Sequence, residues 1–158
     1  MLSIFDGLRD FTLLSVAVRM VLAVICGGII GMERALRRRP AGFRTHILVC
    51  LGAAMTTMTS QYLYLYLDYY TDMARLGAQV IAGIGFLGAG TIVISRQRVR
   101  GLTTAAGLWA AAIIGLAVGA GFYEGAILTT VLVELAATVF LKLEKQVITR
   151  TSNIHIFL

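Results

Sequence analysis

Five long apolar runs, separated by short connections, constrain the fold of this chain more than any other feature. A bilayer core about 30 Å thick is crossed by a helix of roughly 20 apolar residues. Runs of about this length cover residues 12–32, 43–66, 76–95, 102–119 and 122–141. The chain is 58% hydrophobic, with a mean hydropathy of +0.84, and is more apolar than an ordinary soluble domain. The sequence therefore predicts an all-α polytopic membrane protein with five transmembrane helices.

The charged residues predict how these helices are oriented. Five spans would place three basic groups on one side of the membrane: Arg34, Arg37, Arg38, Arg39 and Arg44; Arg96, Arg98 and Arg100; Lys142, Lys145 and Arg150. The other side would carry Asp6, Asp10, Asp68, Asp72 and Glu124, with only Arg9 and Arg75. Basic connections stay in the cytoplasm, so we expect the N-terminus outside and the C-terminus inside. The net charge of +6 then lies at headgroup level, which favours the lipid bilayer over nucleic acid as the partner.

Two segments, 21–53 and 80–112, resemble each other at a constant offset of 59 residues. The identical pairs are Val21/Val80, Ala23/Ala82, Ile25/Ile84, Gly31/Gly90, Arg37/Arg96, Arg39/Arg98, Gly42/Gly101, Thr45/Thr104 and Ala53/Ala112. This pattern favours a parallel repeat of helices 1–2 and 3–4, a known way of building membrane proteins. Chance similarity between two Gly/Ala-rich apolar helices is the alternative.

Glycines recur at helical spacing within the apolar runs. Residues 83–88 match the dinucleotide-binding pattern Gly-x-Gly-x-x-Gly, but they lie inside a membrane-length run without the acidic residue that the pattern requires about 20 positions later. Glycine faces instead allow helices to pack closely. The residues that we expect to serve helix packing are Gly27, Gly31, Gly83, Gly85, Gly88, Gly90, Gly101, Trp109, Gly115 and Gly119. Helix breaking at 88–90 is the functional alternative, and Trp109 with the Gly115–Gly119 face is the expected contact of a possible homodimer.

Ionisable residues within apolar runs are costly and are candidates for function. Glu134 would lie roughly 12 Å from the inner end of its helix, where its carboxylate needs a partner. The predicted functional polar cluster on that side is Glu33, Arg34, Arg39, Arg44, Thr45, His46 and Glu134. Thr45 is also expected to cap the second helix, and Arg19 to extend outward toward the membrane surface. A smaller outer polar group consists of Asp72, Arg75 and Gln79.

No catalytic motif is present in the sequence, so we predict neither an enzyme nor a bound cofactor. Cys26 and Cys50 both fall inside apolar runs. We interpret them as small core residues without a disulfide or metal role.

Several of these motifs, in this order, resemble the MgtC/SapB family of bacterial inner-membrane proteins over roughly residues 13–140. The resemblance rests on Gly31-Met-Glu33-Arg34, Arg39-Pro-Ala-Gly-Phe-Arg44-Thr45-His46, Arg75-x-x-x-Gln79-Val80, Gly83-Ile-Gly-Phe-Leu-Gly-Ala-Gly90, and Gly101-Leu-Thr-Thr-Ala-Ala106 with Trp109. It implies five helices in the bacterial plasma membrane. Many family members continue into a soluble cytoplasmic domain, so residues 1–150 are expected to form the membrane domain and 151–158 to begin a tail or a missing C-terminal domain.

The resemblance also implies a role in magnesium limitation, acid stress or virulence. The function expected from it is non-enzymatic regulation through other membrane proteins, with ATP synthase or transporters as candidate partners. The alternative is a transporter or channel for magnesium or another small ion. Arginines at the cytoplasmic side do not favour a magnesium entrance, because they repel a divalent cation.

Overall fold

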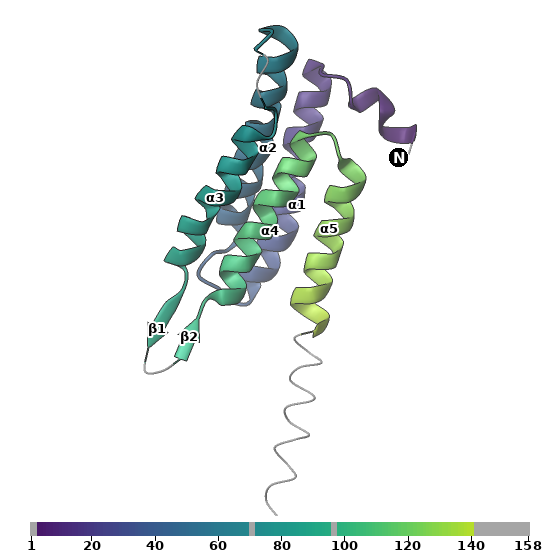
Figure 1. The fold of residues 1–158 in the computed structure, drawn as a ribbon. Coiled ribbons are helices and arrows are strands. Elements are labelled where there is room, and N and C mark those ends of the chain that lie inside the picture. Colours follow the sequence, from purple (N-terminus) through teal and green to yellow (C-terminus); the bar gives the residue numbers. More distant parts are fainter. Residues whose placement is uncertain (1–2, 70–71, 96–97, 141–158) are drawn as a thin grey trace, which may run out of the picture.

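The chain folds into a bundle of five antiparallel α-helices with one short β-hairpin. The computed structural model describes residues 3–69, 72–95 and 98–140. The elements are η1 (Ser3–Leu8), α1 (Leu13–Leu36), α2 (Phe43–Tyr66), α3 (Arg75–Gly90), β1 (Val93–Ser95), β2 (Arg98–Arg100), α4 (Leu102–Gly119), α5 (Tyr123–Leu135) and the π-helical turn η2 (Ala136–Phe140). The helices run alternately in opposite directions (Figure 1). The all-α class predicted from the apolar runs is confirmed.

The two ends of the bundle differ in charge. Residues 37–42 and the β1–β2 hairpin lie at one end, which we call the basic end (Figure 1). The connection from α2 to α3 and residues 120–122 lie at the other, which we call the opposite end. The charged tail residues Lys142, Lys145 and Arg150, together with the whole of 151–158, fall outside the described residues.

The first two long helices begin in different ways. Thr12 and Ser15 form a capping box, in which each side-chain oxygen accepts a hydrogen bond from the other residue's backbone N–H, at 3.2 and 3.0 Å. The start of α2 follows Gly42 directly and has no side-chain cap. Thr45 is the third residue inside that helix, so the prediction that it caps α2 is wrong.

The third apolar run ends as a helix five residues earlier than predicted. The helix α3 stops at Gly90, and Val93–Ser95 pair with Arg98–Arg100 as an antiparallel hairpin in which Val93 faces Arg100 and Ser95 faces Arg98. Consecutive β-branched residues at 91–94 favour extended structure, and glycine weakens a helix end. The predicted span to residue 95 is therefore wrong, while residues 96–97 lie outside the described part.

Close backbone contacts place α2 between α1 and α4. A Cβ atom added to Gly27 of α1 would lie 2.7 Å from the carbonyl oxygen of His46 in α2. A Cβ added to Gly115 or Gly119 of α4 would collide with the carbonyl oxygens of Cys50 and Ala54, also in α2. Each of these crossings therefore requires glycine.

Small side chains fill the core between the helices. One cluster joins α1, α2, α4 and α5 through Ala23, Cys26, Ile30, Cys50, Ala54, Met58, Ile114, Val118 and Ala126. A second joins the 37–42 turn, α2, α3 and α4 through Ala41, Ala53, Ile84, Leu108 and Ala112. Both cysteines are free thiols within the first cluster. Since small residues line both clusters, backbone proximity rather than large side chains sets the spacing of the helices.

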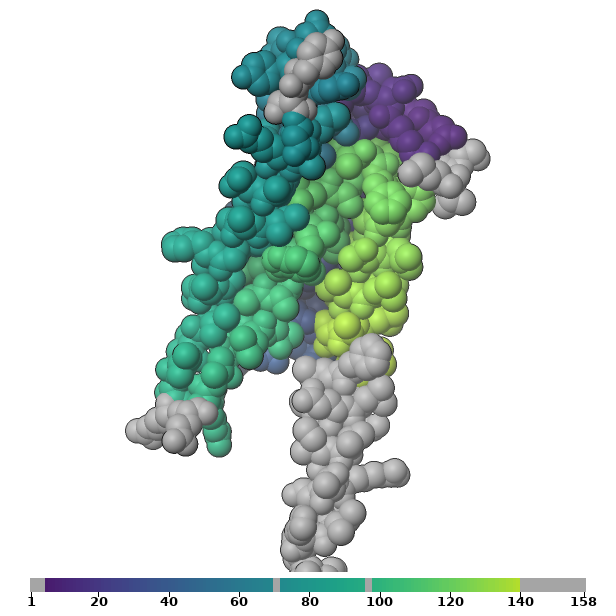
Figure 2. Space-filling model, in the orientation of Figure 1, coloured from purple at the N-terminus to yellow at the C-terminus, as the bar shows by residue number. Residues whose placement is uncertain are grey.

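The outer surface of the bundle is strongly apolar. Leu13, Leu36 and Phe86 are each more than four-fifths exposed. Within the described residues, α1 and α4 are long and apolar enough to cross a membrane. In Figure 2, α3 (teal) and α5 (yellow-green) form the two edges of the visible face. An apolar surface this extensive is typical of a protein that contacts lipid or other proteins.

The glycine crossings generate a stability prediction. We expect Gly115→Ala to lower the free energy of unfolding by about 1–3 kcal/mol, because the added methyl group overpacks the contact with Cys50. Denaturation with SDS in mixed micelles measures this change. Gly85→Ala is the matched control, since a Cβ at Gly85 meets no atom within 4 Å. Equal stability of the two variants would contradict the assigned role of Gly115.

Candidate functional site

The last turn of α1 carries an ion-paired group at the basic end. Glu33 contacts Arg34, with 2.7 Å between Oε2 and Nε, and it also pairs with the Nε of Arg37. The side chains of Glu33 and Arg34 are only 8% and 5% exposed. One carboxylate therefore holds two guanidinium groups in a largely dehydrated environment, where ion pairs are strongly coupled to their surroundings.

His46 lies next to this group, in the first turn of α2, and is fully buried. Its Nδ1 lies 2.9 Å from the carbonyl oxygen of Gly42, which fits donation from a protonated Nδ1. Nε2 is buried and has no hydrogen-bond partner among the described residues. It faces α4, where a Cβ added to Gly107 would lie 3.4 Å away. His46 interacts electrostatically with Glu33 and Arg34.

Glu134 approaches the same group from α5. Together with Glu33 and Arg37, it lines a groove of about 720 Å³ between α1 and α5. Its Oε2 is buried and has no hydrogen-bond partner in the described part of the chain. Four residues of the predicted polar cluster, namely Glu33, Arg34, His46 and Glu134, are thus brought together, with electrostatic interactions linking them.

The other members of the predicted cluster lie elsewhere. Arg39, Arg44 and Thr45 are exposed. Arg44 and Thr45 line a separate groove of about 570 Å³ between α2 and α3. The structure therefore divides the predicted cluster into a buried group and an exposed, basic surface.

The predicted outer polar group is exposed at the start of α3. The Asp72 carboxylate accepts a hydrogen bond from the backbone N–H of Ala74 at 2.9 Å. Arg75 and Gln79 lie on the first turns of α3 and are also exposed. No pairing among the three side chains is found in the described residues, so this group is a helix start rather than a built site.

The glycines predicted for packing fall into two groups, those that contact a neighbouring segment and those that do not. Gly31 lies close to the backbone of Phe43, and a Cβ added to Gly88 would lie 3.4 Å from the Cβ of Ala105. Gly101 turns the chain from β2 into α4 with φ of +95°, a conformation suited to glycine. A Cβ at Gly83, Gly85 or Gly90 would meet no atom within 4 Å, and Trp109 is half-exposed. These three positions of α3 therefore have no other part of the described chain packed against them.

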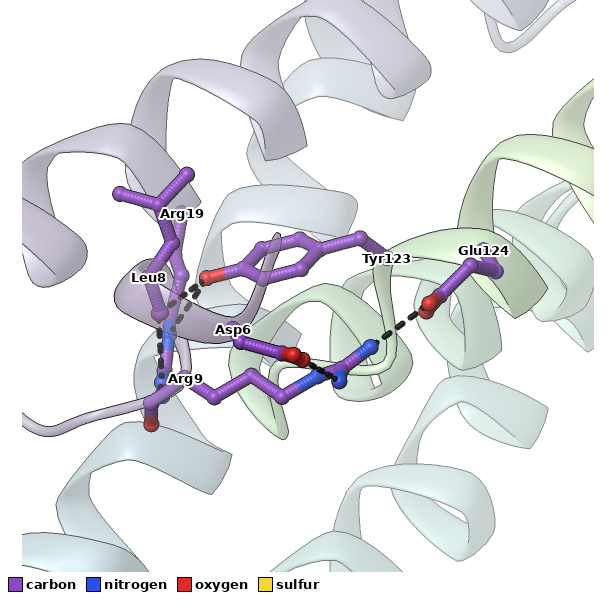
Figure 3. Close-up of polar contacts among 6 residues, drawn as sticks. All are labelled: Asp6, Leu8, Arg9, Arg19, Tyr123 and Glu124. Carbon is purple, nitrogen blue, oxygen red and sulfur yellow. Dashed lines mark hydrogen bonds and ion pairs between the residues drawn. The ribbon is translucent and has the colours of Figure 1, made fainter. Parts of the chain in front are cut away.

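A site at the opposite end, centred on Arg19, was not predicted from the sequence (Figure 3). We expected Arg19 to extend toward the membrane surface, but its side chain is buried, with 1% of the residue exposed, so that prediction is wrong. Its five N–H donors meet five neutral oxygens. These are the Tyr123 hydroxyl at 3.2 Å, the Gln61 side-chain oxygen at 2.7 Å, and the carbonyl oxygens of Gly119 at 2.9 Å, Leu8 at 3.3 Å and Arg9 at 2.8 Å. All the donors of this guanidinium are therefore satisfied within the fold.

Arg9 reinforces the same junction. It pairs with Asp6 at 2.5 Å and with Glu124 at 2.6 Å, and so links η1 to the first turn of α5 (Figure 3). Tyr123 donates a hydrogen bond to the Leu8 carbonyl at 2.7 Å. The one sequence signal for this site was an arginine inside an apolar run, and two of its partners, Gly119 and Tyr123, lie 100 and 104 positions away in the chain.

The described residues contain no group of three or more His, Cys, Asp or Glu side chains that could hold a metal ion. The chemistry of both ends is therefore that of guanidinium groups held by carboxylates or neutral oxygens. A five-helix bundle with an apolar outer surface, charged ends and buried arginine networks is typical of helical membrane proteins.

Comparison with known proteins is consistent with that class. Residues 20–146 match the profile of the MgtC family, and the chain belongs to this family. "Putative magnesium transporter YhiD" of Escherichia coli (strain K12) is 40% identical over 145 residues, which cover 89% of this chain and 67% of the relative. No solved structure matches the chain.

Two further relatives carry the names from which the family is known. Protein SapB of Bacillus subtilis (strain 168) is 41% identical over 70% of this chain and 50% of its own length. Protein MgtC of Salmonella typhimurium (strain 14028s / SGSC 2262) is 40% identical over 78% of this chain and 51% of its own length. The chain thus spans about half the length of these two relatives.

Replacing Arg19 tests the network at the opposite end. We expect Arg19→Met to lower the free energy of unfolding by about 3 kcal/mol or more, because several buried acceptors lose their donor. Arg19→Lys keeps the charge but has only three N–H donors, so it should restore only part of this loss. SDS titration in micelles measures both.

Arg75→Met is the matched control, because Arg75 is exposed and its substitution should change stability by less than about 0.5 kcal/mol. An Arg19→Met variant as stable as this control would contradict the assigned network.

Proposed function

We propose that this chain is the five-span membrane domain of an MgtC-type protein of the bacterial inner membrane, with its N-terminus outside, and that it regulates other membrane proteins without catalysing a reaction. The observation that carries this proposal is that three carboxylates, those of Asp6, Glu33 and Glu124, are ion-paired with arginines within the fold. Glu33 pairs with Arg34 and Arg37, and Arg9 pairs with Asp6 and Glu124. A carboxylate neutralised by guanidinium groups is poorly suited to receive a divalent cation.

The packing of the central helices supports the same proposal. A Cβ at Gly115 or Gly119 would collide with the backbone of α2, so α2 and α4 are in direct contact along this stretch. A conduction path needs space and polar groups along its length. By contrast, the open glycines Gly83, Gly85 and Gly90 leave positions along α3 that another membrane protein can approach closely.

The five-span topology and the repeat are supported by the arrangement of the helices. The segments rich in arginine meet at one end of the bundle, as the positive-inside rule requires. The helices α2 and α4 begin at Phe43 and Leu102, an offset of 59 residues, and each follows a glycine. The first helices of the two halves differ in length. At the repeat positions where α1 is still helical, α3 has ended and the chain forms the β1–β2 hairpin.

Ion transport is the second candidate function. Glu134 favours it, because this side chain has a buried, unpartnered oxygen in a groove at the basic end. The name of the Escherichia coli relative also refers to magnesium transport. Under this alternative, Glu134 would be a ligand on an ion path, and its substitution would abolish flux.

The two functions are separated by measuring both partner capture and flux. We expect crosslinking and affinity purification from native membranes, grown at low and high magnesium, to recover a stoichiometric membrane-protein partner. Gly85→Trp, at an open glycine of α3, should abolish its recovery. Val131→Trp, at a half-exposed position of α5, is the matched control and should retain the partner.

Purified protein in liposomes should give no magnesium flux above that of protein-free vesicles. Saturable flux that is lost in Glu134→Gln, together with recovery of this chain alone from native membranes, would overturn the regulatory proposal and establish transport.

A further inference from the structure

The groove between α1 and α5 combines a long apolar floor with a charged end. Its apolar lining is Val24, Ile25, Gly28, Ile29, Met32, Leu36 and Phe43, and its polar lining is Glu33, Arg37, Glu134 and Thr138. From Val24 to Glu33 the groove follows α1 for about 14 Å, at 1.5 Å per residue. The charged end lies toward the basic end of the bundle, which is the headgroup level if the chain is inserted as proposed above.

The charged end offers both kinds of hydrogen-bonding group. Arg37 uses its Nε for the ion pair with Glu33, and its two Nη groups carry four further N–H donors. Glu134 offers a hydrogen-bond acceptor, because its buried Oε2 accepts no hydrogen bond within the described residues. A group that complements this end must bring an anion for the guanidinium and a donor for the carboxylate.

Charge balance narrows the choice of ligand. Two carboxylates, Glu33 and Glu134, interact with two guanidinium groups, Arg34 and Arg37, so this group of four is close to neutral. A ligand with no net charge preserves that balance, whereas an anionic ligand leaves one negative charge uncompensated.

We propose that this groove binds a phosphatidylethanolamine molecule of the inner leaflet. One acyl chain lies along Val24, Ile25 and Ile29. The phosphate accepts hydrogen bonds from the Nη groups of Arg37, and the primary ammonium donates to the carboxylate of Glu134. The lipid thereby supplies the partner that the Glu134 carboxylate lacks within the described part of the fold.

Phosphatidylcholine provides a matched control ligand. It has the same acyl chains, the same phosphate and the same net charge, but its quaternary ammonium has no N–H to donate. Native mass spectrometry of the full chain, titrated with each lipid in detergent, measures retention. We expect phosphatidylethanolamine to bind about tenfold more tightly than phosphatidylcholine, the difference that one charge-assisted hydrogen bond produces.

Two variants connect this preference to the groove. Glu134→Leu should remove the preference for phosphatidylethanolamine over phosphatidylcholine, because the carboxylate that accepts from the primary ammonium is gone. Ile25→Trp, at a half-exposed position in the apolar lining, should weaken retention of both lipids by filling the groove. Val131→Trp has the same exposed fraction as Ile25, lies outside this groove and should bind like the wild type.

Equal retention of the two lipids by the wild type, or stronger retention of phosphatidylglycerol than of phosphatidylethanolamine, would overturn the proposal. An unchanged preference in Glu134→Leu, or unchanged retention of both lipids in Ile25→Trp, would also overturn it. If Glu134→Leu does not fold, the comparison of Ile25→Trp with Val131→Trp still decides the outcome.

A photo-crosslinking residue at position 29 identifies the occupant in native membranes. We expect a lipid adduct, and a protein adduct in its place would assign the groove to a partner helix and reject the lipid. These results are independent of partner capture through α3 and of magnesium flux, so failure of the lipid proposal is distinguishable from failure of the proposed function.

Discussion

The structure depends on the close approach of two glycine-bearing helices to the backbone of α2. Gly27 and Gly31 allow α1 to lie against it on one side, and Gly115 and Gly119 allow α4 to do so on the other. Association of apolar helices in a bilayer receives little help from the hydrophobic effect, so packing contacts and buried hydrogen bonds must hold the helices together. This three-helix unit positions both ends of the bundle, because Glu33, His46 and Arg19 all project from α1 or α2.

The two ends use arginine in different ways. At the basic end, Arg34 and Arg37 share one carboxylate, and the neighbouring Glu134 retains an oxygen without a partner in the described residues. At the opposite end, Arg19 is surrounded by neutral oxygens that satisfy every donor. Glu134 at the basic end therefore has bonding capacity left for a ligand, whereas all the donors of Arg19 at the opposite end are used. This contrast explains why the proposed lipid site lies at the basic end.

The sequence predicted the helices better than it predicted the polar contacts. The limits of α2 and α4 agree with the apolar runs 43–66 and 102–119, because apolar length and flanking glycines mark both. The end of α3 was misplaced because the apolar run continues through β-branched residues that form a strand. Hydrophobicity alone does not distinguish a strand from a helix in so short a segment. Arg19 was misplaced because an arginine in an apolar run can either snorkel or be buried, and partners distant in sequence decide which.

The separation of Arg19 from its partners has a consequence for biosynthesis. Helix α1 leaves the ribosome long before Gly119 and Tyr123 are made, since chains are synthesised from the N-terminus. Until the α4–α5 turn is made, the guanidinium lacks two of its five acceptors. The hydrogen-bond network around Arg19 is therefore completed only after the last helix of the bundle has begun.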